Sequence, residues 1–442
     1  MNLVAMKLKL HPALATLFFC SSLLHSCEEN NSFPVEVDWI KANAHRPLSV
    51  DPSEVDFSDL QFLKSIIGDK RVIMLGEATH GDGTTFLAKC RLIKFLHTEM
   101  DFDIIAFESG IYECHKSWLD MKAGKNGIQS AKESVSKVWS YTPEVYPLFD
   151  YIDNSKPSLE LIGIDHQFLG TNKLDFNEDL ELFLQMRNSN FVNSADWIDK
   201  KQILNDLIDS GLNPNSIGSD KLLEAKEIIE SLIAEVATFD QSPNTELMND
   251  AQFWILLLKN FQVNTQFLQM VSEGNVQGYW LRDRQMADNL SWILDRYPNR
   301  KIIVWGANTH ISRYIQDAKY YINSDNSYVS SAAGYIPMGE HIFEKYGNVM
   351  YSIGFTAYNG DYFDFQSFTK LTLSPQSNSI ESYMNQSGEE YLFVDYKGIL
   401  PNWLSQPFFS GVFAYGKVQN DWANSFDGLF YTRTMTASNY GK

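Results

Sequence analysis

A carboxylate and an imidazole, Glu77 and His80, stand three residues apart just after a short apolar segment. The apolar residues Val72–Leu75 are typical of a buried strand of a parallel sheet. A carboxylate beside an imidazole can orient the ring, fix its tautomer and raise its basicity, so this pair is a candidate general base. The same spacing also fits a turn histidine in a capping motif, with Thr79 or Asp82 capping the next helix.

Polar side chains also follow three further apolar runs. The runs and the polar residues after them are 104–107 with Glu108, 161–164 with Asp165 and His166, and Ile302–Trp305 with Asn308. The carboxyl ends of parallel strands meet at one edge of an open sheet, and this edge lines the ligand crevice. The four runs therefore predict a site built from carboxylates, imidazoles and amides at that edge.

The elements between these runs predict the fold that positions the polar groups. Residues 86–98 have the periodicity of a helix, which indicates a strand–helix–strand unit with parallel strands and a right-handed crossover. Residues 171–275 are mostly helical in pattern, and strand patterns return after residue 335. We therefore predict an α/β fold with a mainly parallel sheet core flanked by helices, and a helical insertion or lid over about 171–275.

Composition narrows the class of protein. The 442 residues include 36 Lys and Arg against 55 Asp and Glu, a net charge of −19. So acidic a surface argues against a nucleic-acid partner. The four cysteines contain no C-x-x-C pair, which excludes a cysteine-built zinc site. Cys90 and Cys114 are either a disulfide pair or two buried free thiols.

The amino terminus has the pattern of an export signal. Lys7 and Lys9 precede an apolar stretch, residues 14–24, that is too short for a permanent transmembrane helix. It ends in Leu-His-Ser-Cys, which resembles a bacterial lipobox with Cys27 as the lipidated residue. We expect a lipid-anchored protein of the cell envelope, on the outer membrane or cell surface, with periplasmic or secreted protein as the alternative. The predicted division is a lipoprotein signal peptide at 1–26, a tether and lead-in segment at 27–50, and a catalytic domain at 51–442.

Taken together, the motifs resemble the erythromycin esterase family over about residues 55–435. The matching segments are Gly76-Glu77-Ala78-Thr79-His80-Gly81, Phe107-Glu108, Trp139 with Glu144, Gly163-Ile164-Asp165, residues 284–289 (RQMADN), Trp305-Gly306-Ala307-Asn308-Thr309-His310, Met338-Gly339 and Ile353-Gly354-Phe355-Thr356. The resemblance implies an α/β core with a helical subdomain over a deep cleft, and hydrolysis of an ester or lactone.

The resemblance also implies which residues act. It assigns catalysis to His80 and His310, assisted by Glu77 and Glu108, and it places Lys89 where the family has Arg. His80 would activate water, and His310 would polarise the ester carbonyl or protonate the leaving alcohol. Lys89 would stabilise the oxyanion or the carboxylate product. The alternatives are a turn histidine, a structural histidine and a solvated helix lysine.

Five further residues are expected to bind the substrate: Asp165, His166, Arg284, Asn308 and Trp305. Arg284 is predicted to be an ion-pair partner on the cleft wall. For Asp165 and His166 the alternative is a helix cap or a buried hydrogen bond.

Two departures from the family pattern bear on the substrate. Ala307 stands where the family usually has a second His, and Lys89 lacks the bidentate fork of Arg. Since a site that binds its substrate by hydrogen bonds loses selectivity with the donors, we expect weak macrolide opening and activity on smaller or more apolar esters.

The chain contains no G-x-S-x-G elbow, phosphate-binding loop or dinucleotide fingerprint. We therefore expect direct attack by activated water, without a cofactor. One alternative is a hydrolase with a divalent metal among His80, His310, Glu77, Glu108 and Asp165, although H-E-x-x-H is absent. Another is a non-catalytic surface protein that binds a ligand, such as a porphyrin, in the same cleft.

Overall fold

The computed structural model describes residues 34–211, 213–321, 328–329, 334–374 and 376–441. The strands in these ranges are β1 (Val72–Leu75), β2 (Ile104–Gly110), β3 (Glu160–Asp165), β4 (Ile302–Trp305), β5 (Lys319–Tyr321), β6 (Tyr328–Val329), β7 (Met350–Asp364), β8 (Thr369–Thr372), β9 (Tyr391–Asp395), β10 (Phe408–Ser410), β11 (Val418–Asn420) and β12 (Gly428–Met435). The main sheet has eight strands in the order β3-β2-β4-β1-β7-β12-β9, with β8 paired to β7. It is parallel except for β8 and β9, so the predicted fold class is confirmed.

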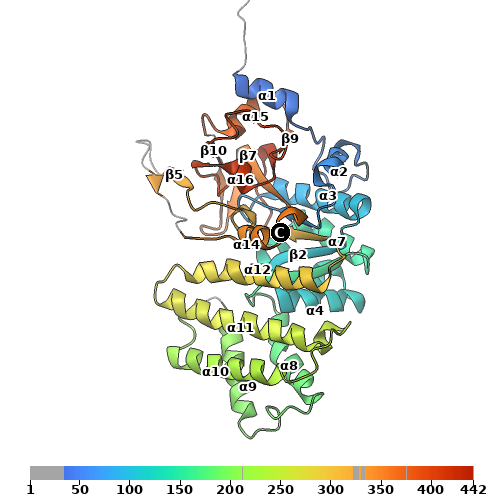
Figure 1. The fold of residues 1–442 in the computed structure, drawn as a ribbon, viewed down its shortest axis with the longest axis vertical. Helices are drawn as coiled ribbons and strands as arrows, with labels where there is room; N and C mark the ends of the chain where they lie inside the picture. The colour runs from blue at the N-terminus through green and yellow to red at the C-terminus, as the bar shows by residue number, and fades with distance from the viewer. Residues whose placement is uncertain (1–33, 212, 322–327, 330–333, 375, 442) are drawn as a thin grey trace, which may run out of the picture.

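Helices surround this sheet (Figure 1). They are α1 (Val35–Asn43), α2 (Phe62–Ile67), α3 (Gly83–Met100), α4 (Ile111–Lys122), α5 (Gly127–Ser134), α6 (Lys137–Ser140), α7 (Tyr146–Ser155), α8 (Phe176–Gln185), α9 (Trp197–Ser210), α10 (Ser219–Val236), α11 (Ala251–Ser272), α12 (Gly278–Arg296), α13 (Asn308–Ile311), α14 (Met338–Tyr346), α15 (Ile380–Ser387) and α16 (Trp422–Ser425). A small antiparallel sheet, β10-β11-β5-β6, lies beside the main one.

Both faces of the main sheet are buried, which explains why its strands are apolar runs without alternation. In β1, Val72 and Met74 belong to one hydrophobic core, and Ile73 and Leu75 belong to a second core on the opposite face. The first core includes the long helices after β3, and the second includes α3 and α7. A three-layer architecture holds the strand ends in fixed positions.

The register of the central strands brings the predicted polar edge together. Leu75 at the end of β1 pairs with Trp305 of β4 and with Ile353 of β7, and Trp305 also pairs with Phe107 of β2. The residues that follow Leu75, Phe107 and Trp305 therefore leave the sheet side by side. This register places Glu77, Glu108 and the chain around His310 at one edge.

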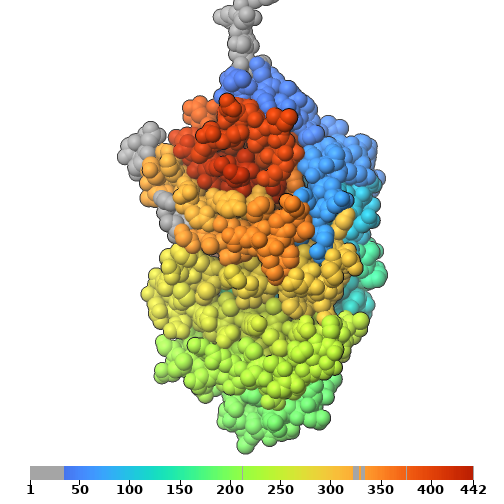
Figure 2. Space-filling model, in the orientation of Figure 1, coloured from blue at the N-terminus to red at the C-terminus, as the bar shows by residue number. Residues whose placement is uncertain are grey.

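The helices after β3 are stacked outward from the sheet. Helix α12 contacts β3, α11 contacts α12, α10 contacts α11, and α9 contacts α10. In the space-filling view these helices, coloured green to yellow, fill the lower half of the molecule and border the orange part of the chain directly (Figure 2). The described residues of the predicted insertion, 171–275, are thus helical and lie on one side of the sheet.

Some of the predictions for the amino terminus concern residues that the structure describes, and others do not. The signal peptide, residues 1–26, and the lipidation residue Cys27 lie outside it. Residues 34–50 of the predicted tether and lead-in segment include α1, which contacts α15 and buries Val37 and Ile40. Within the described ranges, no helix is long and apolar enough to cross a bilayer. Cys90 and Cys114 are both buried free thiols.

Candidate active site

Glu77 is the centre of the first polar cluster. The chain leaves β1 through Gly76, where a Cβ atom would lie 2.0 Å from Asn308 Oδ1, so only glycine fits this approach. Glu77 is fully buried, and its carboxylate accepts hydrogen bonds from His80 Nδ1 at 2.9 Å, Trp139 Nε1 at 2.9 Å and Lys89 Nζ at 2.7 Å. Three donors thus fix the position and charge of this carboxylate.

His80 is the exposed member of this cluster. Because the Glu77 carboxylate accepts, we assign the ring proton to Nδ1 and a lone pair to Nε2. The ring meets Trp139 edge-on with centroids 5.3 Å apart, and 36% of the side chain remains exposed. This is the arrangement that a general base needs, with an oriented ring and a free basic nitrogen.

Lys89 is buried and does not face the cavity, contrary to its predicted contact with the oxyanion or product. Its ammonium donates to Glu77 and lies 3.9 Å from the centre of the Trp305 ring. Burial lowers the pKa of Lys89, against the opposing effect of the Glu77 and Glu108 carboxylates. Lys89 points inward because α3 packs this face against the sheet, so its role is to hold Glu77 in place.

Glu108 is the centre of the second cluster. It accepts hydrogen bonds from Arg282 Nη2 at 2.6 Å and from the Ala307 amide at 2.8 Å, and His310 Nε2 lies 3.3 Å away. Burial by itself raises the pKa of Glu108, but His310 and Arg282 hold it well below its ordinary value. Arg282 also donates to Asp165 Oδ2 at 3.0 and 2.7 Å. The guanidinium therefore joins the ends of β2 and β3.

His310 is held between carboxylates. Its Nδ1 lies 2.9 Å from Asp283 Oδ1, and Asp283 in turn accepts hydrogen bonds from the Tyr335 hydroxyl and the Met338 amide. Burial by itself lowers the pKa of His310, but the Asp283 and Glu108 carboxylates raise it to about 10. The cluster explains this direction, since three carboxylates face one guanidinium and a proton on His310 reduces the remaining negative charge.

The Nε2 atom of His310 has two neighbours of opposite character. The carboxylate atom Glu108 Oε1, 3.3 Å away, can only accept a hydrogen bond. The guanidinium atom Arg282 Nη1, 3.1 Å away, can only donate one. A protonated Nε2 is therefore directed toward Glu108, and a neutral Nε2 accepts from Arg282. The excess of carboxylates favours the protonated form.

Both histidines line one cavity of about 640 Å³, although 230 positions separate them in the chain. Its walls also include Ala307 and a largely aromatic group: Tyr320, Tyr362, Phe363, Phe365 and Phe413. A second cavity of about 400 Å³ shares His310 and contains Arg282, Trp280 and Tyr335. The two cavities flank His310 and offer mostly apolar surface around a few charged groups, as is typical of small-molecule sites.

Arg284 does not lie on the cleft wall, so that prediction is wrong. Its side chain is 62% exposed and pairs with Asp288 one helical turn further on. Arg282 occupies the predicted position instead. Two residues of α-helix correspond to a rotation of about 200°, which puts Arg282 and Arg284 on opposite faces of α12.

Asn308 and Trp305 are structural rather than free to bind a substrate, so these two predictions are also wrong. The Asn308 amide bonds to the carbonyls of Phe355 and Val412 and accepts from the Phe355 amide, which uses its polar atoms. Trp305 is fully buried in the second core, stacked on Phe107. In β4 its side chain points into a sheet face because successive side chains alternate between the faces.

Asp165 and His166 were both predicted to bind the substrate, and the structure places their side chains differently. Asp165 positions Arg282 and is itself fully buried, so it acts on the cleft through the guanidinium. His166 packs against Phe267 of α11 and is buried, and burial lowers its pKa to about 4. No hydrogen-bond partner for either ring nitrogen of His166 occurs within the described ranges. Its predicted contact with the substrate is therefore wrong, because the ring is turned into the helical layer.

Three residues of the two clusters were not selected as site residues from the sequence: Trp139, Arg282 and Asp283. A signal for Arg282 existed, because Arg282, Gln285, Met286 and Asn289 have the i, i+3, i+4, i+7 spacing of one helix face. The last three of these are buried and Arg282 is nearly so. Asp283 has no comparable local signal, since its partners Tyr335 and Met338 are more than fifty positions away.

The donor chemistry of the clusters bears on the metal alternative. Within the described ranges, no three His, Cys, Asp or Glu side chains are grouped as ligands of one metal ion. The carboxylates that a metal would use are instead bound by Lys89, Arg282 and the Trp139 indole. In this arrangement the carboxylates act as hydrogen-bond acceptors for these donors.

Comparisons with known proteins agree on one family. A family model described as erythromycin esterase matches residues 97–435. “Putative hydrolase YbfO” of Bacillus subtilis (strain 168) is 28% identical over 90% of this chain and 91% of its own length. “Erythromycin esterase type II” of Escherichia coli is 23% identical over 91% of this chain and 98% of its own length. A solved structure of a mutant of the erythromycin esterase EreC, in an open conformation, shares the fold with a TM-score of 0.68, 17% identity, and coverage of 90% of this chain and 99% of that chain.

Proposed function

The chain belongs to the erythromycin esterase family, and from this membership we propose that it hydrolyses carboxylic esters or lactones with water activated by His80. The observation that carries the proposal is the Glu77–His80 pair, which opens onto the same cavity as His310. The family relation makes the chain a relative of macrolide esterases. The geometry supports a reaction in which one histidine is a base and the other is an acid.

His80 is the proposed base. Its Nδ1 proton is held by Glu77, and the residue lines a cavity of about 640 Å³, which has room for a water molecule and an ester group. When Nε2 takes a proton from water, the charge that develops on the ring is stabilised by the Glu77 carboxylate. Lys89 and Trp139 keep Glu77 in position during this step without contacting the substrate.

His310 and Arg282 form the proposed electrophilic side. The raised pKa keeps His310 protonated at neutral pH, so it can donate to the carbonyl oxygen and later to the leaving alcohol. The contact from Nε2 to Glu108 is long at 3.3 Å, and a substrate oxygen can compete for this proton. The two histidines thus have different surroundings: His80 is bound by one carboxylate, and His310 lies between two carboxylates and Arg282.

The cavity walls favour an ester of moderate size with apolar or aromatic groups. Tyr362, Phe363 and Phe413 line one cavity, and Trp280 and Tyr335 line the other. Ala307 has no side-chain donor where the family usually has His, and Lys89 is buried behind Glu77. We therefore propose that macrolide lactones are opened slowly or not at all.

The proposed setting is the cell envelope. If Cys27 is lipidated, helix α1 begins eight positions further along the chain, at Val35, so the connection to the membrane is short. The net charge of −19 disfavours nucleic acid as a partner, so the proposed partners are a small-molecule ester and the membrane through the lipid.

A hydrolysis screen tests the proposal. Aryl acetates, short lactones and erythromycin are offered to the wild type and to the His80→Ala and His310→Ala variants. His97→Ala is the matched control, since this histidine bonds to Tyr151 at the far end of α3. We expect turnover of at least one small ester, a loss of about 10²-fold or more in both cleft variants, and an unchanged rate in the control.

Other results would replace the proposal. Turnover that vanishes with a chelator and returns with a divalent metal would favour the metal-dependent alternative. No turnover by the wild type, together with tight retention of a small molecule by the same cavity, would favour the binding protein.

A further inference from the structure

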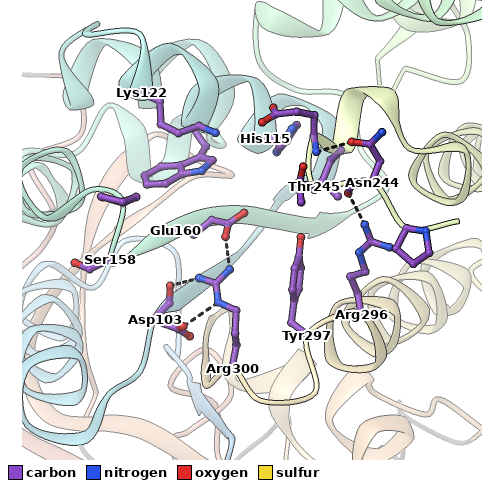
Figure 3. Close-up of a pocket in the computed structure, with 15 residues that line it drawn as sticks. Asp103, His115, Lys122, Ser158, Glu160, Asn244, Thr245, Arg296, Tyr297 and Arg300 are labelled. Atoms are coloured by element: carbon purple, nitrogen blue, oxygen red, sulfur yellow. Dashed lines mark hydrogen bonds and ion pairs between the residues drawn. The ribbon is translucent and has the colours of Figure 1, made fainter.

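A third cavity, with a volume of about 640 Å³, lies at the opposite ends of the strands of the main sheet (Figure 3). Its floor includes Asp103, directly before β2, and Glu160, the first residue of β3. Glu108 and Asp165 stand at the other ends of the same strands. Asp103 and Glu108 are five residues apart, as are Glu160 and Asp165, so the two sites are about 17 Å apart along the sheet. This far-edge cleft is therefore separate from the proposed hydrolytic site.

His115 is the most unusual residue of the far-edge cleft. It is only 4% exposed, yet neither ring nitrogen has a hydrogen-bond partner among the described residues. Burial lowers the pKa of His115 to about 3, with a further lowering by Lys122 and Lys116, so the ring is neutral. A neutral imidazole has one donor and one acceptor, and leaving both unpaired in the interior is costly. Because the ring lines the cavity, a ligand hydroxyl group is a candidate hydrogen-bond partner for it.

Arg296 provides a second buried donor. Its Nη2 donates to the Asn244 carbonyl at 2.6 Å and to Asp250 at 2.7 Å, while Nη1 is buried without a partner in the described part of the chain. Figure 3 shows His115 on the upper side of this site and Tyr297 on the lower side, with the Glu160 carboxylate beside them and bound to Arg300. Donors and acceptors thus converge on one space.

The charge of the lining points to a neutral ligand. Three cations, Lys122, Arg296 and Arg300, are balanced by three carboxylates, Asp103, Glu160 and Glu246. Arg300 is already paired with both Asp103 and Glu160, and Arg296 is paired with Asp250. Lys122 and Glu246 form no ion pair among the described residues, but the lining as a whole carries no excess charge that would select a phosphate or an ammonium ion.

The remaining walls are apolar and partly aromatic. Trp118, Tyr297, Pro157, Pro243 and Leu247 line the cavity beside the polar groups. A pyranose ring has an apolar C–H face that packs on aromatic rings, and its hydroxyl groups both donate and accept. Paired charged side chains such as Arg300 with Glu160 are suitable partners for hydroxyl groups because their geometry is already fixed.

We propose that the far-edge cleft is a binding site for a neutral saccharide. The sugar ring lies against Trp118 and Tyr297, and its hydroxyl groups bond to His115, Arg296 and the carboxylate of Glu160. The site is independent of the hydrolytic reaction, since it shares no residue with the cavity of His80 and His310.

The experiment measures binding directly by saturation-transfer NMR on the full chain. The probes are methyl α-D-glucopyranoside, methyl β-D-galactopyranoside and methyl N-acetyl-β-D-glucosaminide, with inorganic phosphate as the charged comparison. His115→Phe keeps a planar ring and removes both polar atoms. His166→Phe is the matched control, because His166 is equally buried and unpartnered but lies outside the cleft.

We expect at least one glycoside to bind the wild type and the His166→Phe variant, and to bind the His115→Phe variant about tenfold or more weakly. Thermal unfolding of both variants should match or exceed that of the wild type, since each removes an unpaired buried polar group, so lost binding cannot reflect lost folding. Absence of glycoside binding by the wild type, equal binding by the His115→Phe variant, or displacement of the glycoside by phosphate would each overturn the proposal.

Discussion

The Asp283→Asn substitution tests whether carboxylates hold His310 as a cation. Asp283 Oδ1 lies 2.9 Å from Nδ1 of His310, and Glu108 Oε1 lies 3.3 Å from Nε2. Burial by itself lowers the pKa of His310, but these two carboxylates raise it to about 10. An adjacent opposite charge commonly moves a pKa by about 1–3 pH units, so removal of the Asp283 charge should lower the pKa of His310 to about 8.

The change is expected to alter charge and leave the geometry intact. The single side-chain oxygen of the introduced asparagine can still accept from His310 Nδ1 and the Met338 amide, because Asp283 Oδ1 serves both now, and its NH₂ can donate to the Tyr335 oxygen. A pKa that falls by about 2 pH units corresponds to about 3 kcal/mol of lost preference for the cation. At pH 9 the protonated fraction then falls about tenfold, and at pH 6.5 it hardly changes.

Two measurements check this expectation. Histidine ring protons are titrated by NMR, with the His310 signal identified by its absence in the His310→Asn variant. The pH profile of kcat/KM is then measured on the best ester, corrected for spontaneous hydrolysis, and should lose about tenfold at pH 9 but not at pH 6.5. Asp288→Asn is the control, because Asp288 lies on the exposed face of the same helix and pairs with Arg284. An unchanged His310 titration, or a rate loss equal at every pH, would refute the reasoning.

Three further outcomes follow from the same clusters. Glu77→Gln should lower turnover by about 10²-fold. It should also lower the free energy of unfolding by about 3 kcal/mol, because it leaves the buried Lys89 ammonium without its carboxylate partner. Adding Lys89→Met should restore the stability, measured by urea unfolding, but not the rate. Arg282→Lys should cost about tenfold or more in kcat/KM because it loses the fork that joins Glu108 and Asp165, whereas Arg284→Lys should have no effect on the same assay. The folded-state pKa of His310 is raised from 6.5 to about 10, so the stabilising contribution of its proton is complete below pH 6.5 and is lost between pH 6.5 and 10. The urea midpoint of the wild type should therefore fall through that range relative to the midpoint of the His310→Asn variant. Midpoints that change in parallel would contradict this expectation.

Much of the fold was predictable because its signals are local. The strands β1 and β4 have the predicted bounds, since each is an apolar run buried on both faces and ended by polar residues or glycine. Helix α11, Ala251–Ser272, likewise lies within the region that was predicted to be mostly helical. The order of the strands was not predictable in the same way. The central position of β1, between β4 and β7, depends on pairings between residues more than two hundred positions apart.

Some residues of the candidate site could likewise be predicted from the sequence, and others could not. Glu77 and His80 could be paired from the sequence because a contact three residues apart in one turn requires little knowledge of the rest of the molecule. The choice between Arg282 and Arg284 required the orientation of α12 on β3, which alone decides which helix face is buried. Lys89 was identified as important from the sequence. Its inward direction followed from the packing of α3, and this direction makes it a support of Glu77 and not a contact of the substrate.

The sequence by itself determined the class of fold, the family resemblance and one half of the candidate chemistry, the carboxylate–imidazole pair at the end of β1. Hydrophobic periodicity and a short turn are enough for these features because they depend on neighbouring residues. The tertiary structure alone decided that His310 is bound by Asp283 and that Arg282 bridges Glu108 and Asp165 across 174 and 117 positions of the chain. Such contacts exist only once the sheet and the helical layer have packed together, because ion pairs between distant segments are formed by burial and not by local backbone geometry.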